Sequence, residues 1–224
     1  MPGASGDQDR GSAALIAVIH EEGVHDERVL DAFRRVPRER FVPTRLIGSS
    51  SLDRPIPIPH GQVTTQPSLI ARILEALGLV GTERVLEVGT GLGFQTALLA
   101  HLADEVVSIE RFLDLAGWAR RNLEAAGIEN VRVVVGDGTL GAPDAAPFDA
   151  IVVSAASPQV PAPLVEQLAE GGRLVHPVGP GGEELVFSFL KEGGSLVRER
   201  LIVPAHFVRL VGAHGLPDEP FEGR

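Results

Sequence analysis

The sequence predicts an α/β fold with a doubly wound, mostly parallel sheet, preceded by an N-terminal helical and loop extension. Three observations favour this fold. From residue 83 onward, short apolar segments alternate with segments of helical periodicity. A glycine-rich turn at residues 89–93 directly follows the first of these strands. The 224 residues, 44% of them hydrophobic, suit one α/β domain with a sizeable core.

The predicted strands cover residues 84–88, 105–109, 131–135, 148–153 and 172–177. The predicted helices between them cover residues 94–102, 112–126 and 163–168. This alternation places helices on both faces of a parallel sheet. Residues 184–190 and 196–203 flank a glycine-containing turn at 192–195, which predicts an antiparallel hairpin at the end of the sheet.

The residues before the alternating region show helical periodicity followed by a proline- and glycine-rich stretch. Apolar spacing within residues 12–35 predicts two short helices, with Asp26 as N-cap of the second. Prolines and glycines exclude a regular helix over residues 41–66, and the next helix begins at Pro67. We therefore expect a flexible N-terminus (1–11), a substrate-side extension (12–66), the sheet-containing core (67–210) and a C-terminal tail (211–224).

Composition excludes several functions. The chain has no cysteine, which rules out thiolate catalysis, and its seven histidines are too scattered to predict a metal site. No apolar segment is long enough to span a membrane, and the N-terminus lacks signal-peptide features, so we expect a cytoplasmic protein with no membrane partner. The net charge of −10 argues against a nucleic-acid partner, and we interpret the basic run at 34–40 as a solvated face.

The glycine-rich turn is the main candidate for a cofactor site. Its glycines are Gly89, Gly91 and Gly93, and Phe94 stands where a dinucleotide fingerprint has its third glycine. The Gly-Lys-Ser/Thr sequence of a phosphate-binding P-loop is absent. Glu87 precedes the turn and Thr90 lies within it, so we assign both to the cofactor site as well.

Two further acidic positions end neighbouring strands. Glu110 ends the second strand about 20 residues beyond the turn, where an acid binds ribose hydroxyls. Asp137, followed by Gly138, ends the third strand and can accept a hydrogen bond from an adenine amine. The carboxyl ends of parallel strands share one edge, where ligands of such folds bind. The alternative is that each acid only caps a helix or a turn, but their combination favours a cofactor that contains adenosine.

Several sequence blocks resemble the protein-L-isoaspartate (D-aspartate) O-methyltransferase family. They are residues 36–43, 61–67, 87–95, 136–138, 148–156, 171–175 and 177–179, and the resemblance covers roughly residues 12–210. It implies a Rossmann-like methyltransferase fold, S-adenosyl-L-methionine as methyl donor and S-adenosyl-L-homocysteine as product. The implied partners are proteins and peptides with isoaspartyl residues, whose α-carboxylate is methylated as the first step of repair. A monomer is expected.

The resemblance also implies the residues on the substrate side. The family motif Thr-Ile-Ser-Gln-Pro corresponds to residues 63–67, so Thr65 takes the position of the catalytic serine, between Thr64 and Gln66. A threonine keeps the hydroxyl and adds a methyl group. The alternative reading makes Thr65 only the N-cap of the Pro67 helix. The loop after the fourth strand, with Ser154, Ala155 and Ala156, is implied to border methyl donor and substrate.

Other functions remain open at this point. A relative of the family could methylate one aspartate of a ribosomal peptide and so install a succinimide. A non-catalytic module that binds S-adenosylmethionine belongs to a different class, and the substrate-side motifs argue against it. The glycine spacing argues against a dehydrogenase. A nucleic-acid methyltransferase would carry an Asn-Pro-Pro-Tyr type of motif, which this sequence lacks.

Overall fold

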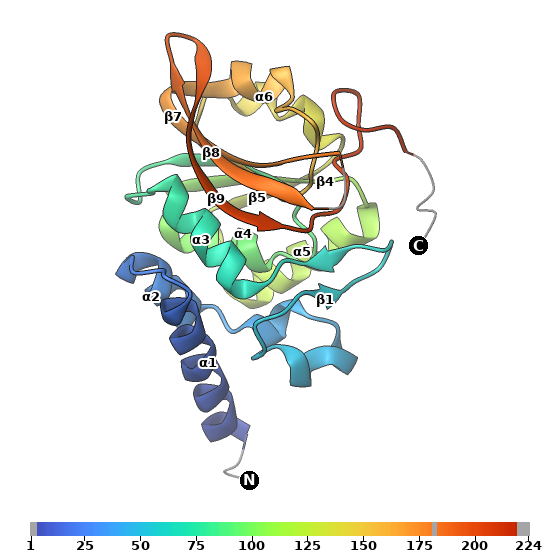
Figure 1. Cartoon of the computed structure of the whole chain (residues 1–224). Helices are drawn as coiled ribbons and strands as arrows, with labels where there is room; N and C mark the ends of the chain where they lie inside the picture. The colour runs from blue at the N-terminus through green and yellow to red at the C-terminus, as the bar shows by residue number, and fades with distance from the viewer. Residues whose placement is uncertain (1–3, 181–182, 219–224) are drawn as a thin grey trace.

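A seven-stranded sheet forms the centre of the molecule in a computed structural model that describes residues 4–180 and 183–218 (Figure 1). The strand order is β5-β4-β3-β6-β7-β8-β9. The strands are β3 (Arg84–Val88), β4 (Glu105–Glu110), β5 (Val131–Val135), β6 (Phe148–Val153), β7 (Leu168–Val178), β8 (Glu184–Glu192) and β9 (Ser195–Ala205). Pairing is parallel from β5 to β7, whereas β8 and β9 are antiparallel. The predicted doubly wound sheet with an antiparallel end is confirmed.

Both faces of the central strands β3, β4 and β6 are buried, which explains why these strands read as largely apolar runs, whereas the edge strands β5 and β9 are more exposed. Val85, on β3, packs in a cluster with residues of the helices on one face. Its neighbour Leu86 packs on the opposite face, in a cluster that includes Leu164 of α6 (Ala162–Gln167). Successive residues of a strand point to opposite faces, so one strand contributes to both cores.

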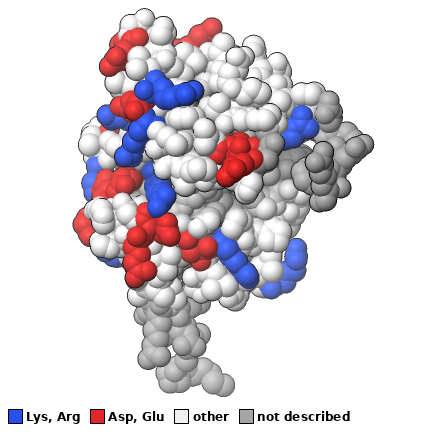
Figure 2. Space-filling model, in the orientation of Figure 1, with Lys and Arg blue, Asp and Glu red and all other residues white. Residues whose placement is uncertain are grey.

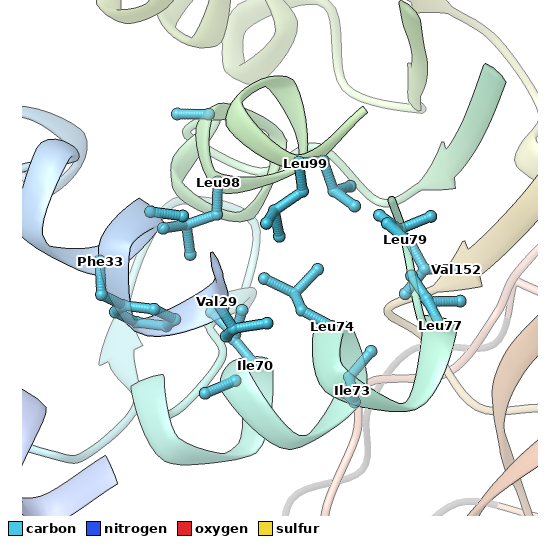
Figure 3. Close-up of a cluster of buried hydrophobic side chains, with 14 of the residues drawn as sticks. Val29, Phe33, Ile70, Ile73, Leu74, Leu77, Leu79, Leu98, Leu99 and Val152 are labelled. Carbon is cyan, nitrogen blue, oxygen red and sulfur yellow. The ribbon is translucent and has the colours of Figure 1, made fainter. Parts of the chain in front are cut away.

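Helix α3 (Pro67–Leu77) and helix α4 (Phe94–Leu102) form the larger core together with α2 (Glu27–Arg35). Figure 3 shows their apolar side chains converging in one cluster. In α3, Ile70, Ile73, Leu74 and Leu77 follow the spacing that places apolar residues on one helix face, and all are at most 2% exposed. Burial of each such side chain stabilises the fold by about 1.5–3 kcal/mol. The helix ends at Gly78 with a left-handed φ of 62°, as predicted.

The N-terminal helices confirm one prediction and correct another. Asp26 caps α2, because its carboxylate accepts a hydrogen bond from the backbone nitrogen of Arg28 at 2.8 Å. Helix α1 (Ala4–Glu21), however, begins eight residues before the predicted start at residue 12. Apolar spacing marks only the part of a helix that packs on a core, so it misses polar first turns. Of the stretch predicted to be flexible, residues 1–3 lie outside the described residues.

The proline-rich segment contains short elements that the sequence did not predict. Two 3-10 turns, η1 (Arg38–Phe41) and η2 (Thr44–Ser49), precede a small hairpin of β1 (Ile56–Pro57) and β2 (Val63–Thr64). Strands of two residues are too short to show the alternation by which strands are recognised. The hairpin tip at His60 and Gly61 lies against the start of α5 (Leu113–Ala125), where the His60 ring stacks on Phe112 with a centroid distance of 4.2 Å.

The C-terminal segment is more than the predicted tail. Leu210 is buried, Val211 forms a bridge with Leu216, and the backbone nitrogen of Ala213 donates to Asp137 at 2.7 Å. The folded core therefore extends at least to residue 216, and residues 219–224 lie outside the described residues. The prediction failed because these contacts join residues far apart in the sequence.

Among the described helices, none combines the length and apolar character that a membrane crossing requires.

Candidate active site

Two adjoining cavities open at the carboxyl edge of the sheet. We call the first the glycine-turn cavity; its walls come from the β1–β2 hairpin, the turn after β3, the end of β4, the loop after β6 and the C-terminal segment. Its lining includes Ile58, Gln62, Val63, Thr64, Thr65, Val88, Gly89, Thr90, Gly91, Leu92, Glu110, Phe112, Leu115, Gly138, Ser154, Ala155, Val208, Arg209, Leu210 and Val211.

The second, which we call the loop cavity, lies beside the first and opens between α3 and the end of β9. Its lining includes Glu22, Pro55, Val63, Thr65, Gln66, Ser68, Leu69, Arg72, Ser154, Val203, Pro204, Ala205, His206, Phe207 and Val208. Both cavities are lined by Val63, Thr65, Ser154 and Val208. A group bound in one cavity would therefore meet a group bound in the other at Thr65 and Ser154.

The glycine turn has the backbone that its sequence predicts. Gly89 has a φ of 100°, and a Cβ there would lie 3.2 Å from the Cβ of Ser154, so both conformation and space require glycine. Gly91 has a φ of 57° and also lines the cavity. Gly93 does not line it; a Cβ at that position would lie 3.4 Å from the Cβ of Ala119, so Gly93 allows close packing of α5 instead.

Glu110 lies where the cofactor prediction places it. Its side chain lines the glycine-turn cavity and is 5% exposed. One carboxylate oxygen accepts from the backbone nitrogen of Gly91 at 2.8 Å, and the other accepts from that of Phe112 at 3.1 Å. Burial raises the pKa of Glu110, and the backbone hydrogen bonds partly oppose that rise. The carboxylate is therefore fixed in position at the mouth of the turn.

Glu87 lies beneath the turn and does not line either cavity. It is fully buried, and its oxygens accept hydrogen bonds from Gln95 (2.9 Å), Ser108 (2.6 Å) and Thr96. Burial raises the pKa of Glu87 to about 7, although these hydrogen bonds lower it and the charge of Glu110 adds a smaller rise. Gln95 also donates to the Ser154 hydroxyl at 3.0 Å. Glu87 thus supports the turn from below, and its predicted contact with the cofactor stays a prediction.

Thr90 and Gly138 line the glycine-turn cavity, but Asp137 does not. The Asp137 carboxylate accepts from the backbone nitrogen and hydroxyl of Thr139, at 2.9 and 2.7 Å, and from Ala213. These bonds lower the pKa of Asp137, although burial opposes them. Asp137 thus fixes the C-terminal segment through its hydrogen bond from Ala213. Its predicted hydrogen bond to an adenine amine stays a prediction.

Thr65 lines both cavities, and the alternative that it caps the following helix is wrong. The N-cap of α3 is Gln66, whose side chain makes no capping hydrogen bond. Asp53 performs the capping instead, since its carboxylate accepts from the backbone nitrogen of Ser68 at 2.8 Å. Within residues 4–180 and 183–218, no group hydrogen-bonds to the Thr65 hydroxyl. Thr64 lines the first cavity and Gln66 only the second.

Only some residues of the loop after β6 line the two cavities. Ser154 lines both cavities and Ala155 the first, whereas Ala156 lines neither. Ala156 instead pairs with the C-terminal segment: its nitrogen donates to Val208 and its oxygen accepts from Leu210, both at 2.7 Å. This pairing makes residues 208–211 a cavity wall that the sequence analysis missed. No local pattern signals it, because it depends on a pairing between distant segments.

The glycine-turn cavity suits a cofactor that contains adenosine. Ile58, Phe112 and Leu115 give it an apolar side, and Glu110 presents a carboxylate to it. Gly89 and Gly91 let a ligand approach the backbone closely. The cavity lies at the end of β3, where the strand order reverses and doubly wound sheets bind their ligands. Fold and site together define the class of the Rossmann-like methyltransferases.

Comparison with known proteins makes the assignment more specific. A model of the protein-L-isoaspartate(D-aspartate) O-methyltransferase family matches residues 10–215. A protein-L-isoaspartate O-methyltransferase from Anaeromyxobacter dehalogenans is 52% identical over 201 residues, covering 89% of this chain and 96% of the relative. One from Methanoculleus marisnigri is 49% identical, also over 201 residues, covering 90% and 91%.

Solved structures agree with this result. A protein-L-isoaspartate O-methyltransferase structure has a TM-score of 0.80 and 31% identity, covering 91% of this chain and 67% of that chain. A structure from Plasmodium falciparum, in complex with S-adenosyl-L-homocysteine, shares the fold with a TM-score of 0.77 and 22% identity, covering 88% of this chain and 96% of that one. The chain belongs to the protein-L-isoaspartate (D-aspartate) O-methyltransferase family.

Proposed function

We propose that this protein transfers a methyl group from S-adenosyl-L-methionine to the α-carboxylate of isoaspartyl residues in damaged proteins and peptides. The observation that carries this proposal is that the glycine-turn cavity and the loop cavity share Thr65 and Ser154. A methyl donor in the first cavity and a peptide in the second would meet at these side chains. Family membership supplies the substrate class, an isoaspartyl protein or peptide.

The glycine-turn cavity would hold S-adenosyl-L-methionine through Gly89, Thr90, Gly91, Gly138 and Glu110. Glu110 would bind the ribose hydroxyls, because it ends β4 beside the turn and lines the cavity. Glu87, Gly93 and Asp137 do not line the cavity; they stabilise the turn, the packing of α5 and the C-terminal wall, and the hydrogen bond from an adenine amine to Asp137 stays a prediction.

The reaction requires little acid–base chemistry from the protein. S-adenosyl-L-methionine supplies an activated methyl group on its sulfonium sulfur. The substrate carboxylate is already ionised at neutral pH, so no general base is needed. The protein's own residues align the carboxylate and exclude water. The Thr65 hydroxyl would donate a hydrogen bond to the carboxylate and orient it, which makes Thr65 the catalytic residue.

The loop cavity would hold the peptide around the isoaspartyl residue. Gln66 lines it, Ser154 and Thr65 lie at its boundary with the first cavity, and Ala155 lies just beyond that boundary. Small side chains in this region leave space for a peptide backbone. Ala156 supports the site indirectly, by pairing with residues 208–210. Since the family acts on isoaspartyl proteins, we propose an extended peptide segment as the occupant of the loop cavity.

We propose a monomeric, cytoplasmic enzyme without nucleic-acid or membrane partners. The net charge of −10 disfavours binding to phosphate backbones. On the face in Figure 2, most Lys and Arg side chains lie among Asp and Glu side chains along one edge. Such mixing leaves no broad positive surface on that face to attract a polyanion.

A substrate panel tests the proposal. Isoaspartyl peptides with unrelated flanking sequences would be incubated with the protein and radiolabelled S-adenosyl-L-methionine, and methyl incorporation measured for each. A repair enzyme methylates most of them with similar kcat/KM. Methylation of a single sequence would instead support the alternative of a dedicated peptide substrate. Binding of S-adenosyl-L-methionine without any methylation would support the non-catalytic module.

A further inference from the structure

Two charged side chains hold the segment that carries Thr65 from opposite ends. We propose that Arg38 and Asp53 are positioning residues that fix residues 64–68 so that the Thr65 hydroxyl faces the substrate carboxylate. This inference rests on the proposed function and deepens it. Neither residue lines the glycine-turn cavity or the loop cavity, so both would act through the segment and not by contact with the ligand.

Arg38 holds the first end of the segment. Its side chain is 4% exposed and joins two stretches of chain. One terminal nitrogen donates to the carbonyl oxygens of Leu52 (2.9 Å) and Ser50 (3.3 Å). The other donates to the Thr64 hydroxyl (3.0 Å), to the carbonyl oxygen of Arg54 (2.9 Å) and, at 3.5 Å, to that of Thr65. A planar guanidinium with fixed donor directions suits this task better than a single ammonium.

Asp53 holds the other end. One carboxylate oxygen accepts from the backbone nitrogen of Ser68 at 2.8 Å. The second accepts from the Ser68 hydroxyl at 2.7 Å and from the side-chain amide of Gln66 at 2.8 Å. Asp53 therefore places a negative charge at the N-terminus of α3, where the helix dipole favours it. Arg38 and Asp53 also attract each other electrostatically.

Thr65 lies between two residues, Thr64 and Gln66, whose side chains are fixed by hydrogen bonds, while its own hydroxyl makes no hydrogen bond within the described residues. Arg38 fixes Thr64 and Asp53 fixes Gln66. A threonine at the N-cap position commonly caps a helix with its hydroxyl, but Thr65 lies one residue before the N-cap Gln66. Here the cap comes from a residue fifteen positions before Ser68, so the Thr65 hydroxyl makes no hydrogen bond within the described residues and lies between two cavities. Because Asp53 caps α3, the Thr65 hydroxyl is available to form a hydrogen bond with a ligand.

The role of Thr65 makes its exact placement important. A displacement of about 1 Å at a reacting group can lower turnover by about a hundredfold. The segment lies in a region rich in proline and 3-10 turns, without a regular helix or long strand to position it. Charge-assisted hydrogen bonds of the buried Arg38 and the half-buried Asp53 therefore supply the rigidity that secondary structure does not supply before Pro67.

The test uses Asp53→Asn and Arg38→Lys in the full chain, which preserve size or charge but disturb the hydrogen bonds. Matched controls are Asp31→Asn and Arg35→Lys, which disturb an exposed ion pair on α2 with a separation of 2.6 Å. Four quantities are measured for each folded variant: kcat and KM on an isoaspartyl peptide, the Kd for S-adenosyl-L-homocysteine, and amide hydrogen exchange over residues 63–68. If one of the two test variants does not fold, the same measurements on the other still test the proposal.

We expect kcat of both test variants to fall by roughly tenfold to a hundredfold, because Thr65 loses its alignment. The Kd for S-adenosyl-L-homocysteine should change by less than about threefold, since the cofactor contacts stay intact. Hydrogen exchange over residues 63–68 should become faster, and both control variants should behave like the wild type.

A lower melting temperature with unchanged kcat and unchanged exchange would show a merely structural role and overturn the proposal. An equal loss in the control variants would overturn it too. An inactive wild type that still binds S-adenosyl-L-homocysteine would refute the proposed function instead, and faster exchange in the variants would still show that the two residues hold the segment.

Discussion

The carboxylate of Glu110 accepts a hydrogen bond from the backbone nitrogen of Gly91 at 2.8 Å, which ties the end of β4 to the glycine turn after β3. Two neighbouring strands thus present one carboxylate and one tight turn to the same cavity. This relationship is the structural basis of the proposed cofactor site, and the first prediction tests it.

Replacement of Glu110 by alanine should weaken the binding of S-adenosyl-L-methionine by about tenfold or more. The variant loses hydrogen bonds between a charged carboxylate and the ribose hydroxyls, each worth about 1.5–3 kcal/mol. Isothermal titration calorimetry measures the effect, with Glu124→Ala, an exposed position on α5, as the control. Unchanged affinity in a folded Glu110→Ala protein would refute the assignment of Glu110.

Thr65→Val keeps the shape of the side chain but removes its hydroxyl. Because Asp53 and not Thr65 caps α3, the melting temperature should stay close to that of the wild type. Turnover on an isoaspartyl peptide should fall by about tenfold or more, since a hydrogen bond to a charged group is worth about 1.5–3 kcal/mol. Thr65→Ser, which keeps the hydroxyl, should remain active. A folded Thr65→Val enzyme with full turnover would exclude the catalytic role.

The buried Glu87 predicts a pH dependence of stability. Burial raises its pKa from 4.5 to about 7, so the folded state binds the proton more tightly than the unfolded state does between these values. The free energy of unfolding contributed by this group therefore falls as pH rises from about 4.5 to about 7, and is constant above that range. In Glu87→Gln this contribution is absent.

Thermal unfolding of both proteins at pH values from 5 to 8 measures the effect. Relative to the wild type, Glu87→Gln should gain stability as the pH rises. His176 contributes in the opposite direction, because burial lowers its pKa to about 4, but it is present in both proteins and cancels in the comparison. Parallel curves for the two proteins would contradict the raised pKa of Glu87.

We predict no measurable binding to duplex DNA or RNA at physiological salt. The net charge of −10 and the mixed charges of the face in Figure 2 both oppose it. Electrophoretic mobility shifts over a range of salt concentrations provide the measurement. A salt-sensitive shift at micromolar protein would overturn this prediction.

Periodic patterns predicted most of the fold, and strand ends and glycine spacing predicted several residues that line the glycine-turn cavity. Glu110 and the glycine turn were found because strand ends and glycine spacing are local features of the sequence. Contacts between distant segments were not predictable in this way. Asp53 caps a helix fifteen residues away from it, and Asp137 binds Ala213, 76 residues further along the chain. The sequence near Thr65 alone allows it to cap α3, but this alternative is wrong, because Asp53 caps that helix from a distant part of the chain.

Methyl transfer to an isoaspartyl peptide, compared with its normal aspartyl twin of identical sequence, is the decisive measurement of the proposed activity. The two peptides differ only in which carboxyl group of the aspartate is linked to the next residue. We predict methyl ester formation on the isoaspartyl peptide at a kcat/KM far above that of the twin, with the ester on the α-carboxylate. Equal methylation of both peptides, or none of either by a protein that binds S-adenosyl-L-methionine, would contradict it.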